Sequence, residues 1–275
     1  LLVMEEIMMI TISKEEFEKY VLAATSARCE TYDQVSKQFE SEYNYHVSYC
    51  LGNDTFLDKE SVTEALKRVV SIAAFLHSIP SLDLVITPTG FGVVSTQEVA
   101  PASRERVNAL QEQLSLEYRR CIVKLIDCLR GSDWGITDVA KLRIPTLLYS
   151  VDLCNEYGLK YKSDDEYHTS LVNAAATDLL LRDVISDEYM EELLNDIRCD
   201  GGKADVSIIH RLRMLLVFAQ TNNEKAYSLG IRQLINHLEN NLTKYTTYAA
   251  STAHNNNTYV GFQNTKDSKA FVFVG

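Results

Sequence analysis

Proline and glycine are scarce in this sequence, which contains 4 Pro and 11 Gly among its 275 residues. Chains built only of β-strands need many tight turns, and tight turns depend on these two residue types. The shortage therefore disfavours an all-β fold and favours helices joined by a modest number of loops. Hydrophobic residues make up 46% of the chain, enough for a sizeable core in one large or two small domains.

Positive charge is also in short supply, because 27 Lys and Arg residues face 38 Asp and Glu residues and leave a net charge of −11. Nucleic-acid binding without sequence preference requires Lys and Arg to replace the counterions of the phosphates. The excess of acidic over basic residues therefore argues against DNA binding as the main function. The acidic net charge is compatible with a protein surface along which DNA moves without being bound. Residues 163–200 hold 11 acids against two arginines, and we interpret this region as solvated helical surface.

Signatures of catalysis and metal binding are missing. The six cysteines include no C-x-x-C pair, so we interpret them as reduced thiols that pack as small apolar residues. No two histidines lie three or four residues apart, and H-E-x-x-H, G-x-S-x-G, P-loop and dinucleotide motifs do not occur. The sequence predicts no catalytic residue, no metal ligand and no cofactor, and hence not an enzyme. A site assembled in space from distant Cys, His and acidic residues stays open as the alternative.

Long hydrophobic runs are absent too. No stretch approaches the roughly 18 uncharged apolar residues that a membrane-spanning helix needs. Residues 1–10 are apolar but contain Glu5 and Glu6 and lack a basic leader, so we do not expect a signal peptide there. We expect no membrane partner.

Helical periodicity is the dominant pattern that is present. Apolar residues recur at helical spacing, and Ser13 with Glu16 forms a capping box at the start of the first such segment. We predict a mainly α fold, a helical bundle occupying residues 1–250 with a possible sub-boundary near 131–135. The predicted helices cover residues 13–27, 31–49 in part, 58–79, 104–130, 137–156 with a division at Pro145, 165–181, 186–198, 204–220 and 223–243.

An irregular apolar loop at residues 83–95 interrupts the helices. Pro88, Gly90 and Gly92 punctuate it, so it cannot be one helix, and we expect an extended segment bent at the two glycines. The Phe91 side chain either packs in the core beneath this loop or contacts another subunit. Thr87, Pro88, Gly90, Phe91 and Gly92 are therefore candidate protein-interface residues.

The C-terminal region changes in composition. Residues 251–258 are polar, and we expect them to be a flexible tether. Residues 259–274 read as two short apolar strands around 264–268, which predicts a β-hairpin arm within 251–275. Two strands alone are marginal in water, so the arm should dock on its own domain or on a neighbour by strand addition. The candidate interface residues of this arm are Tyr259, Phe262, Phe271 and Phe273.

A resemblance rests on three stretches: residues 86–95 (ITPTGFGVVS), 99–107 (VAPASRERV) and 266–274 (KDSKAFVFV). With them the chain resembles a family of uncharacterised proteins from Bacteroidales phages and prophages. The central motif is the most specific of the three. Members of that family occur among virion-assembly genes and offer no catalytic motif that could be carried over to this chain.

The resemblance implies a head-to-tail connector, or adaptor, that assembles in the host cytoplasm and resides in the virion. Its expected partners are the portal protein, identical subunits in a ring (a dodecamer), and tail or neck proteins. DNA would pass the ring without sequence-specific binding. The alternatives are another neck or tail component, such as a head-completion or tail-terminator protein, and, from a different class, an enzyme or a monomeric binding module.

Overall fold

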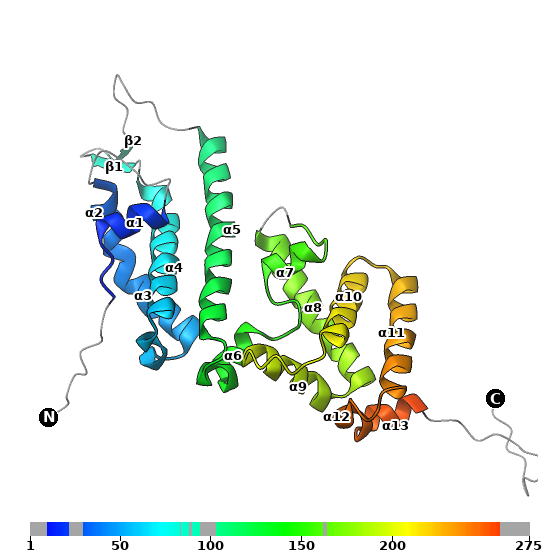
Figure 1. Cartoon of the computed structure of the whole chain (residues 1–275). Coiled ribbons are helices and arrows are strands. Elements are labelled where there is room, and N and C mark those ends of the chain that lie inside the picture. The colour runs from blue at the N-terminus through cyan, green and yellow to red at the C-terminus, as the bar shows by residue number, and fades with distance from the viewer. Residues whose placement is uncertain are drawn as a thin grey trace, which may run out of the picture.

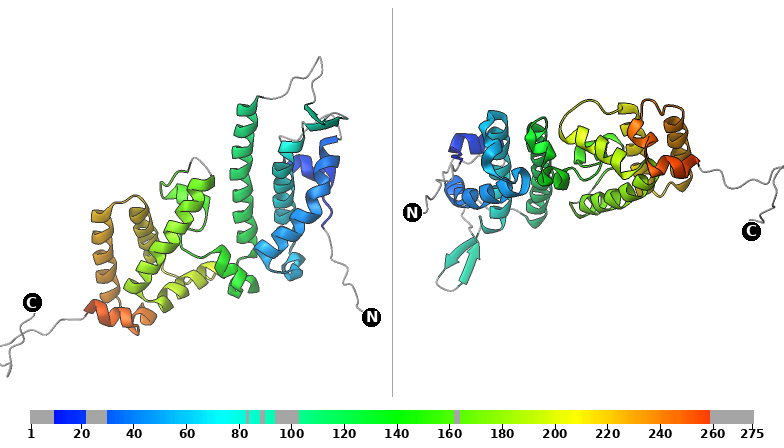
Figure 2. Two further views of the ribbon diagram at one scale, coloured as in Figure 1. Left: turned by 180° about the vertical axis from the view of Figure 1, so that it is seen from behind. Right: turned by 90° about the horizontal axis from the view of Figure 1, so that it is seen from below.

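The computed structural model describes residues 10–21, 30–82, 84–87, 90–93, 103–161 and 164–258. The fold is mainly helical, as predicted. Figure 1 shows two groups of helices side by side, the first formed by α1–α5 and the second by α7–α13. Figure 2 shows the same arrangement from behind and from below.

The first group is built on two long helices, α4 (Glu60–Ser78) and α5 (Arg104–Leu129), which pack side by side (Figure 1). The predicted capping box is confirmed, because Ser13 and Glu16 form both of its bonds, and Ser103 caps α5 in addition. The remaining elements are α1 (Lys14–Tyr20), α2 (Glu30–Val35), η2 (Ser36–Gln38), α3 (Phe39–His46), the π-helical turn η3 (Val47–Leu51), η4 (Asp54–Asp58) and η5 (Ile79–Ser81).

Aromatic rings fill the centre of this first group. Phe17 is fully buried, and its ring centroid lies 5.8 Å from Tyr32, 5.9 Å from Phe39 and 6.3 Å from Phe75. These residues come from α1, α2, α3 and α4. Offset and edge-on contacts of this kind stabilise more than the buried area alone. The cluster therefore fixes the three shorter helices against α4.

The second group contains shorter helices arranged around α8. Pro145 divides α6 from α7, as predicted, because proline cannot donate the backbone hydrogen bond that a continuous helix needs. The elements are η6 (Asp133–Ile136), α6 (Asp138–Arg143), α7 (Val151–Glu156), α8 (Asp164–Ile185), α9 (Asp187–Arg198), α10 (Val206–Gln220), α11 (Glu224–Glu239), α12 (Thr246–Ala249) and α13 (Thr252–Thr258).

The loop at 131–135 links the two groups and is itself part of the core. Trp134 is fully buried, and its Nε1 donates to the Cys50 carbonyl over 2.9 Å. Arg198 is also buried and donates from Nε and Nη2 to the Ile144 carbonyl. One continuous hydrophobic cluster runs through both groups. A domain boundary at 131–135 stays a prediction.

The apolar loop departs from the sequence-based expectation. It forms an antiparallel hairpin of β1 (Leu84–Thr87) and β2 (Gly90–Val93), with Thr87 paired to Gly90 and Leu84 to Val93. The chain reverses between Thr87 and Gly90, so the bend expected at the two glycines is wrong. Gly90 and Gly92 instead lie within β2, where ladder pairing runs through the backbone and does not require a Cβ.

The expected flexible tether at 251–258 is also wrong, because these residues form α13. Its polar side chains bond to the helical body. Asn257 Nδ2 donates to the Val184 carbonyl over 2.8 Å and to Tyr248 Oη over 3.0 Å, and His254 Nδ1 lies 2.9 Å from Glu239 Oε1. The helical body therefore extends to Thr258. The predicted C-terminal hairpin lies outside the described residues.

Candidate functional site

The predicted interface residues of the central segment lie in the β1–β2 hairpin. Thr87 ends β1, and Gly90, Phe91 and Gly92 belong to β2, with Phe91 paired to Ile86. Pro88 lies outside the described residues. So do the four candidates of the C-terminal arm, Tyr259, Phe262, Phe271 and Phe273. The structure thus places four of the nine candidates on one hairpin.

This hairpin projects away from the helices, which is plainest in the view from below in Figure 2. A sheet of two strands has two edges, and each carries backbone N–H and C=O groups that can pair with a further strand. Among the residues that the structure describes, no third strand joins this sheet. An isolated two-stranded sheet is also marginally stable in water. The hairpin is therefore suited to pairing with another chain.

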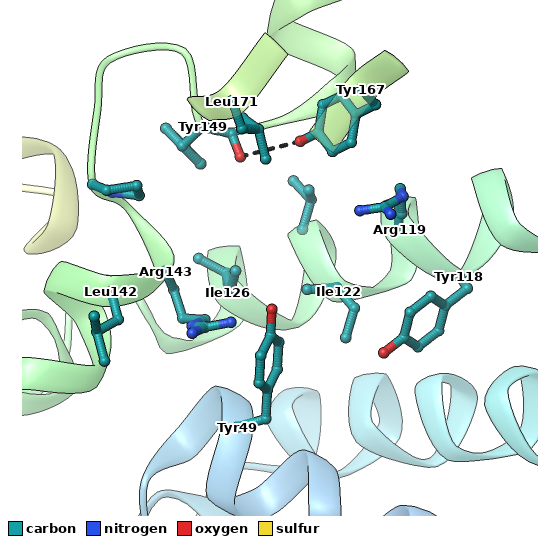
Figure 3. Close-up of a pocket in the computed structure, with 12 residues that line it drawn as sticks. Tyr49, Tyr118, Arg119, Ile122, Ile126, Leu142, Arg143, Tyr149, Tyr167 and Leu171 are labelled. Carbon is teal, nitrogen blue, oxygen red and sulfur yellow. Dashed lines mark hydrogen bonds between the residues drawn. The ribbon is translucent and has the colours of Figure 1, made fainter. Parts of the chain in front are cut away.

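A second feature, which sequence reasoning missed, is a groove between the two helix groups (Figure 3). We call it the tyrosine groove. It has a volume of about 150 Å³, and its walls come from η3, α5, α6, the α6–α7 connection and α8. The lining is aromatic and aliphatic with two arginines: Tyr49, Tyr118, Arg119, Ile122, Val123, Ile126, Leu142, Arg143, Pro145, Tyr149, Tyr167 and Leu171.

Cation–π contacts hold arginine and tyrosine side chains of this groove in fixed positions. The Arg143 guanidinium carbon lies 3.6 Å from the centre of the Tyr49 ring, and that of Arg119 lies 4.9 Å from the Tyr167 ring. Tyr45 stacks on Tyr49 with 5.4 Å between centroids and 13° between planes. Such contacts hold long side chains in one geometry before a partner arrives, which lowers the entropic cost of binding.

Part of the groove is open to solvent although it is hydrophobic. Leu142 is 66% exposed, and Tyr45 and Tyr49 are 55% and 38% exposed. Tyrosine and arginine around an exposed aliphatic side chain are the composition typical of binding hot spots in protein interfaces. The tyrosine groove is thus a candidate protein-binding site.

A buried hydrogen-bond chain supports the floor of the groove. His46, 1% exposed, has Nδ1 2.6 Å from the Glu42 carbonyl and Nε2 2.8 Å from Tyr118 Oη. A carbonyl only accepts, so Nδ1 carries the proton and Nε2 accepts from the Tyr118 hydroxyl. Burial lowers the pKa of His46 and raises the pKa of Tyr118, which keeps both groups neutral. The Tyr118 side chain is thereby held in place.

Three buried cysteines among the described residues are poorly suited to nucleophilic chemistry. Burial raises the pKa of the Cys50 thiol to about 12 and that of Cys121 to about 11, and it also raises the pKa of Cys154. A protonated buried thiol is a poor nucleophile and a poor metal ligand. Over the described ranges, no three His, Cys, Asp or Glu side chains gather in a way that could hold a metal ion. None of the helices described is long and apolar enough to cross a bilayer.

Comparison with known proteins gives one match. Residues 25–139 match a family of unknown function (DUF6712), a span that contains α2–α5 and the β1–β2 hairpin and ends inside α6. No curated protein matches the chain. No solved structure matches it. The matched span includes Tyr49, Tyr118 and the other α5 residues of the tyrosine groove, whereas Arg143 and the α8 wall lie beyond it.

Proposed function

We propose that this chain is a structural subunit of a phage particle that works by binding other proteins, in a head-to-tail connector (adaptor) ring. The observation that carries the proposal is the projecting β1–β2 hairpin. No described residue pairs with its outer edges, and it contains residues 86–87 and 90–93 of the motif at 86–95 on which the resemblance to Bacteroidales phage proteins mainly rests. Strand addition at such an edge gives affinity through the backbone and selectivity through alternate side chains.

In this proposal the hairpin binds the portal protein or an adjacent subunit, and the tyrosine groove receives a second contact. A ring, such as a dodecamer, requires two different faces on each subunit, because head-to-tail contacts close a cycle only when one face binds the other. The hairpin and the groove are two such faces, because the hairpin lies toward the N-terminal end of α5 in Figure 1 and the groove is lined by residues of the C-terminal half of α5. Both serve binding and neither requires a cofactor.

The acidic balance fits a subunit that surrounds a DNA conduit. A net charge of −11 repels phosphates, so DNA would pass the ring without being held. Assembly would take place in the host cytoplasm, and the protein would remain in the virion with tail or neck proteins below it. Another neck or tail component, such as a head-completion or tail-terminator protein, would use the same two faces with a different ring symmetry.

The test is co-assembly of the full chain with the portal protein, assayed by pull-down and by electron microscopy. Phe91→Asp places a charge in β2 and should reduce portal binding or ring formation at least tenfold, with helical circular dichroism unchanged. Val206→Asp is the matched control. Val206 is 78% exposed at the start of α10, where an added acid also suits the helix dipole, so assembly should persist.

Two outcomes would contradict the proposal. If Phe91→Asp assembled as well as the unchanged chain, the hairpin would not be the contact. If the unchanged chain neither bound the portal protein nor associated with itself, an enzyme or a monomeric binding module would be the better account.

A further inference from the structure

Helix α8 is apolar on two opposite faces. One face carries buried residues such as Leu181 and Ile185, which belong to the core. The other face exposes Val172, Leu179 and Leu180, which are 60%, 66% and 59% exposed. A helix of a globular protein normally has one polar face, and a helix that is apolar all round is normally covered all round. The exposed face of α8 is therefore incomplete in a single subunit.

A pocket of about 310 Å³ adjoins this face at Leu180. It lies between α8 and the turn that joins α10 to α11, and Phe218 and Tyr227 line it together with Thr177 and Leu180. The pocket offers mostly apolar surface with room for an aromatic ring. We call the exposed α8 residues and this pocket together the α8 groove.

We propose that the α8 groove binds the C-terminal segment, residues 259–275, of a neighbouring copy of this chain. This rests on the proposed function, because an arm that passes between copies is what would join subunits in a ring. The segment offers Phe262, Phe271 and Phe273 as aromatic anchors. In an extended strand Phe271 and Phe273 project from the same side, so one strand can present both rings to one groove.

The negative charge around the α8 groove favours binding of the C-terminal segment over binding of a second copy's α8 groove. Acids border the groove at Asp183 and Glu224, both exposed, and residues 163–200 hold 11 acids against two arginines. Two such faces would repel each other on contact. The C-terminal segment carries Lys266 and Lys269 against Asp267, so it brings positive charge to an acidic border.

The end of α13 and the length of the C-terminal segment determine how much of an α8 groove the segment can cover. Asn257, near the end of α13, bonds to the carbonyl of Val184, which follows Leu180 by roughly one turn of α8 and lies roughly a third of a turn around the helix from Val172. The described body thus ends beside the Leu180 end of the α8 groove, and the choice of a neighbour's groove over the chain's own follows from the proposed function, in which arms join subunits. Extended, residues 259–275 reach on the order of 55 Å, whereas the 22-residue helix α8 is about 33 Å long. The segment is therefore long enough to span the whole α8 groove.

Photo-crosslinking in the full chain tests the proposal. Benzoylphenylalanine replaces Phe273, and chains labelled with ¹⁵N are mixed with unlabelled chains before assembly and irradiation. Mass spectrometry should find mixed heavy–light crosslinks from position 273 to the peptide that contains Val172–Leu180 or to the pocket residues. Crosslinks within single chains only, or to another part of the surface, would overturn the proposal, as would no crosslink to this chain at all.

Two variants sharpen the result. Leu179→Asp should lower the yield of the mixed crosslink at least tenfold, because a carboxylate replaces the apolar surface on which the aromatic ring packs and must lose its water there, a cost that outweighs its attraction to the lysines. Val206→Asp adds the same charge to an equally exposed valine on α10 and should leave the yield unchanged. If the crosslinks land on the portal protein while rings still form, the α8 proposal fails and the connector proposal stands.

Discussion

Leu142 is the most exposed aliphatic residue of the tyrosine groove, next in sequence to the Arg143 that stacks on Tyr49. We predict that Leu142→Asp weakens binding of the partner at least tenfold, about 1.4 kcal/mol or more, because the new carboxylate must lose water on contact. The melting temperature should hardly change, since the position is open to solvent. Titration calorimetry or biolayer interferometry with the portal protein measures the effect.

The matched control is Ile136→Asp, in the neighbouring element η6. Ile136 is 65% exposed and does not line the groove, so the same charge at that position should leave binding intact. Equal loss of affinity in both variants would show that charge alone, and not the groove, determines binding.

His46 makes stability depend on pH. Its folded-state pKa is lowered by burial below the ordinary value of 6.5, so just below that pH the unfolded chain binds more protons than the folded one. The free energy of unfolding should therefore fall as the pH drops through about 6.5. The Glu42 carboxylate lies 3.7 Å from His46 Nδ1 and 2.6 Å from His77 Nδ1, and its attraction for a proton on His46 is smaller than the effect of burial on the pKa of His46.

Urea unfolding at about pH 7.5 and about pH 5.5 measures this dependence. In His46→Gln the loss of stability between the two values should be smaller than in the unchanged chain, although the variant is less stable at both. An identical pH dependence in the two proteins would mean that His46 is not the titrating group.

At the scale of elements, the helices that could be predicted are those that carry their own signals. Ser13, Ser103 and Ser186 each cap the helix that follows, and Pro145 divides a helix where expected. Such signals are local, because the capping side chain and the N–H groups it binds are within three residues of each other. Local chemistry is therefore enough to find where these helices begin.

Helix α13 and the tyrosine groove depend on contacts between residues that are distant in the sequence, so local sequence signals could not predict them. Helix α13 has almost no apolar periodicity, and it is held by bonds from His254 and Asn257 to Glu239, Val184 and Tyr248. The tyrosine groove joins Tyr49 to Arg143 and Tyr167, which only the packing of α5 brings together. The three tyrosines at 43, 45 and 49 are a sequence signal for this groove, but a cluster of tyrosines alone does not distinguish a packed surface from a binding surface.

A substitution at Gly135 tests how closely η6 packs against the end of α9. A Cβ at this position would lie 2.7 Å from the Arg198 carbonyl oxygen and 2.8 Å from Cys199 Sγ. The backbone of Arg198 cannot easily move, because its side chain bonds to the Ile144 carbonyl. Gly135→Ala should therefore lower the free energy of unfolding by about 1–3 kcal/mol, measured by urea denaturation.

The control is Gly230→Ala in the interior of α11. Its Cβ would meet Leu215 Cδ2 at 2.7 Å, the far end of a flexible side chain that can rotate away. Alanine also favours a helix interior by about 1 kcal/mol over glycine, so this variant should be close to neutral. A Gly135→Ala protein as stable as the control would refute close packing of η6 on α9.

At the scale of the whole molecule, one core joins the two helix groups, and the proposed binding features lie on both. The projecting hairpin belongs to the first group, the α8 groove to the second, and the tyrosine groove lies between them. A substrate site usually draws its residues into one enclosed cleft, whereas these features are spread over separate faces. That distribution is what a subunit with several neighbours requires.

The mass of the assembled protein tests this account most directly. Mass photometry and multi-angle light scattering, over a range of concentrations and with or without the portal protein, would give that mass. The account predicts a discrete oligomer, closed into a ring when viewed by electron microscopy, formed alone or on the portal. The mass of a single chain at every concentration, with and without the portal protein, would contradict it.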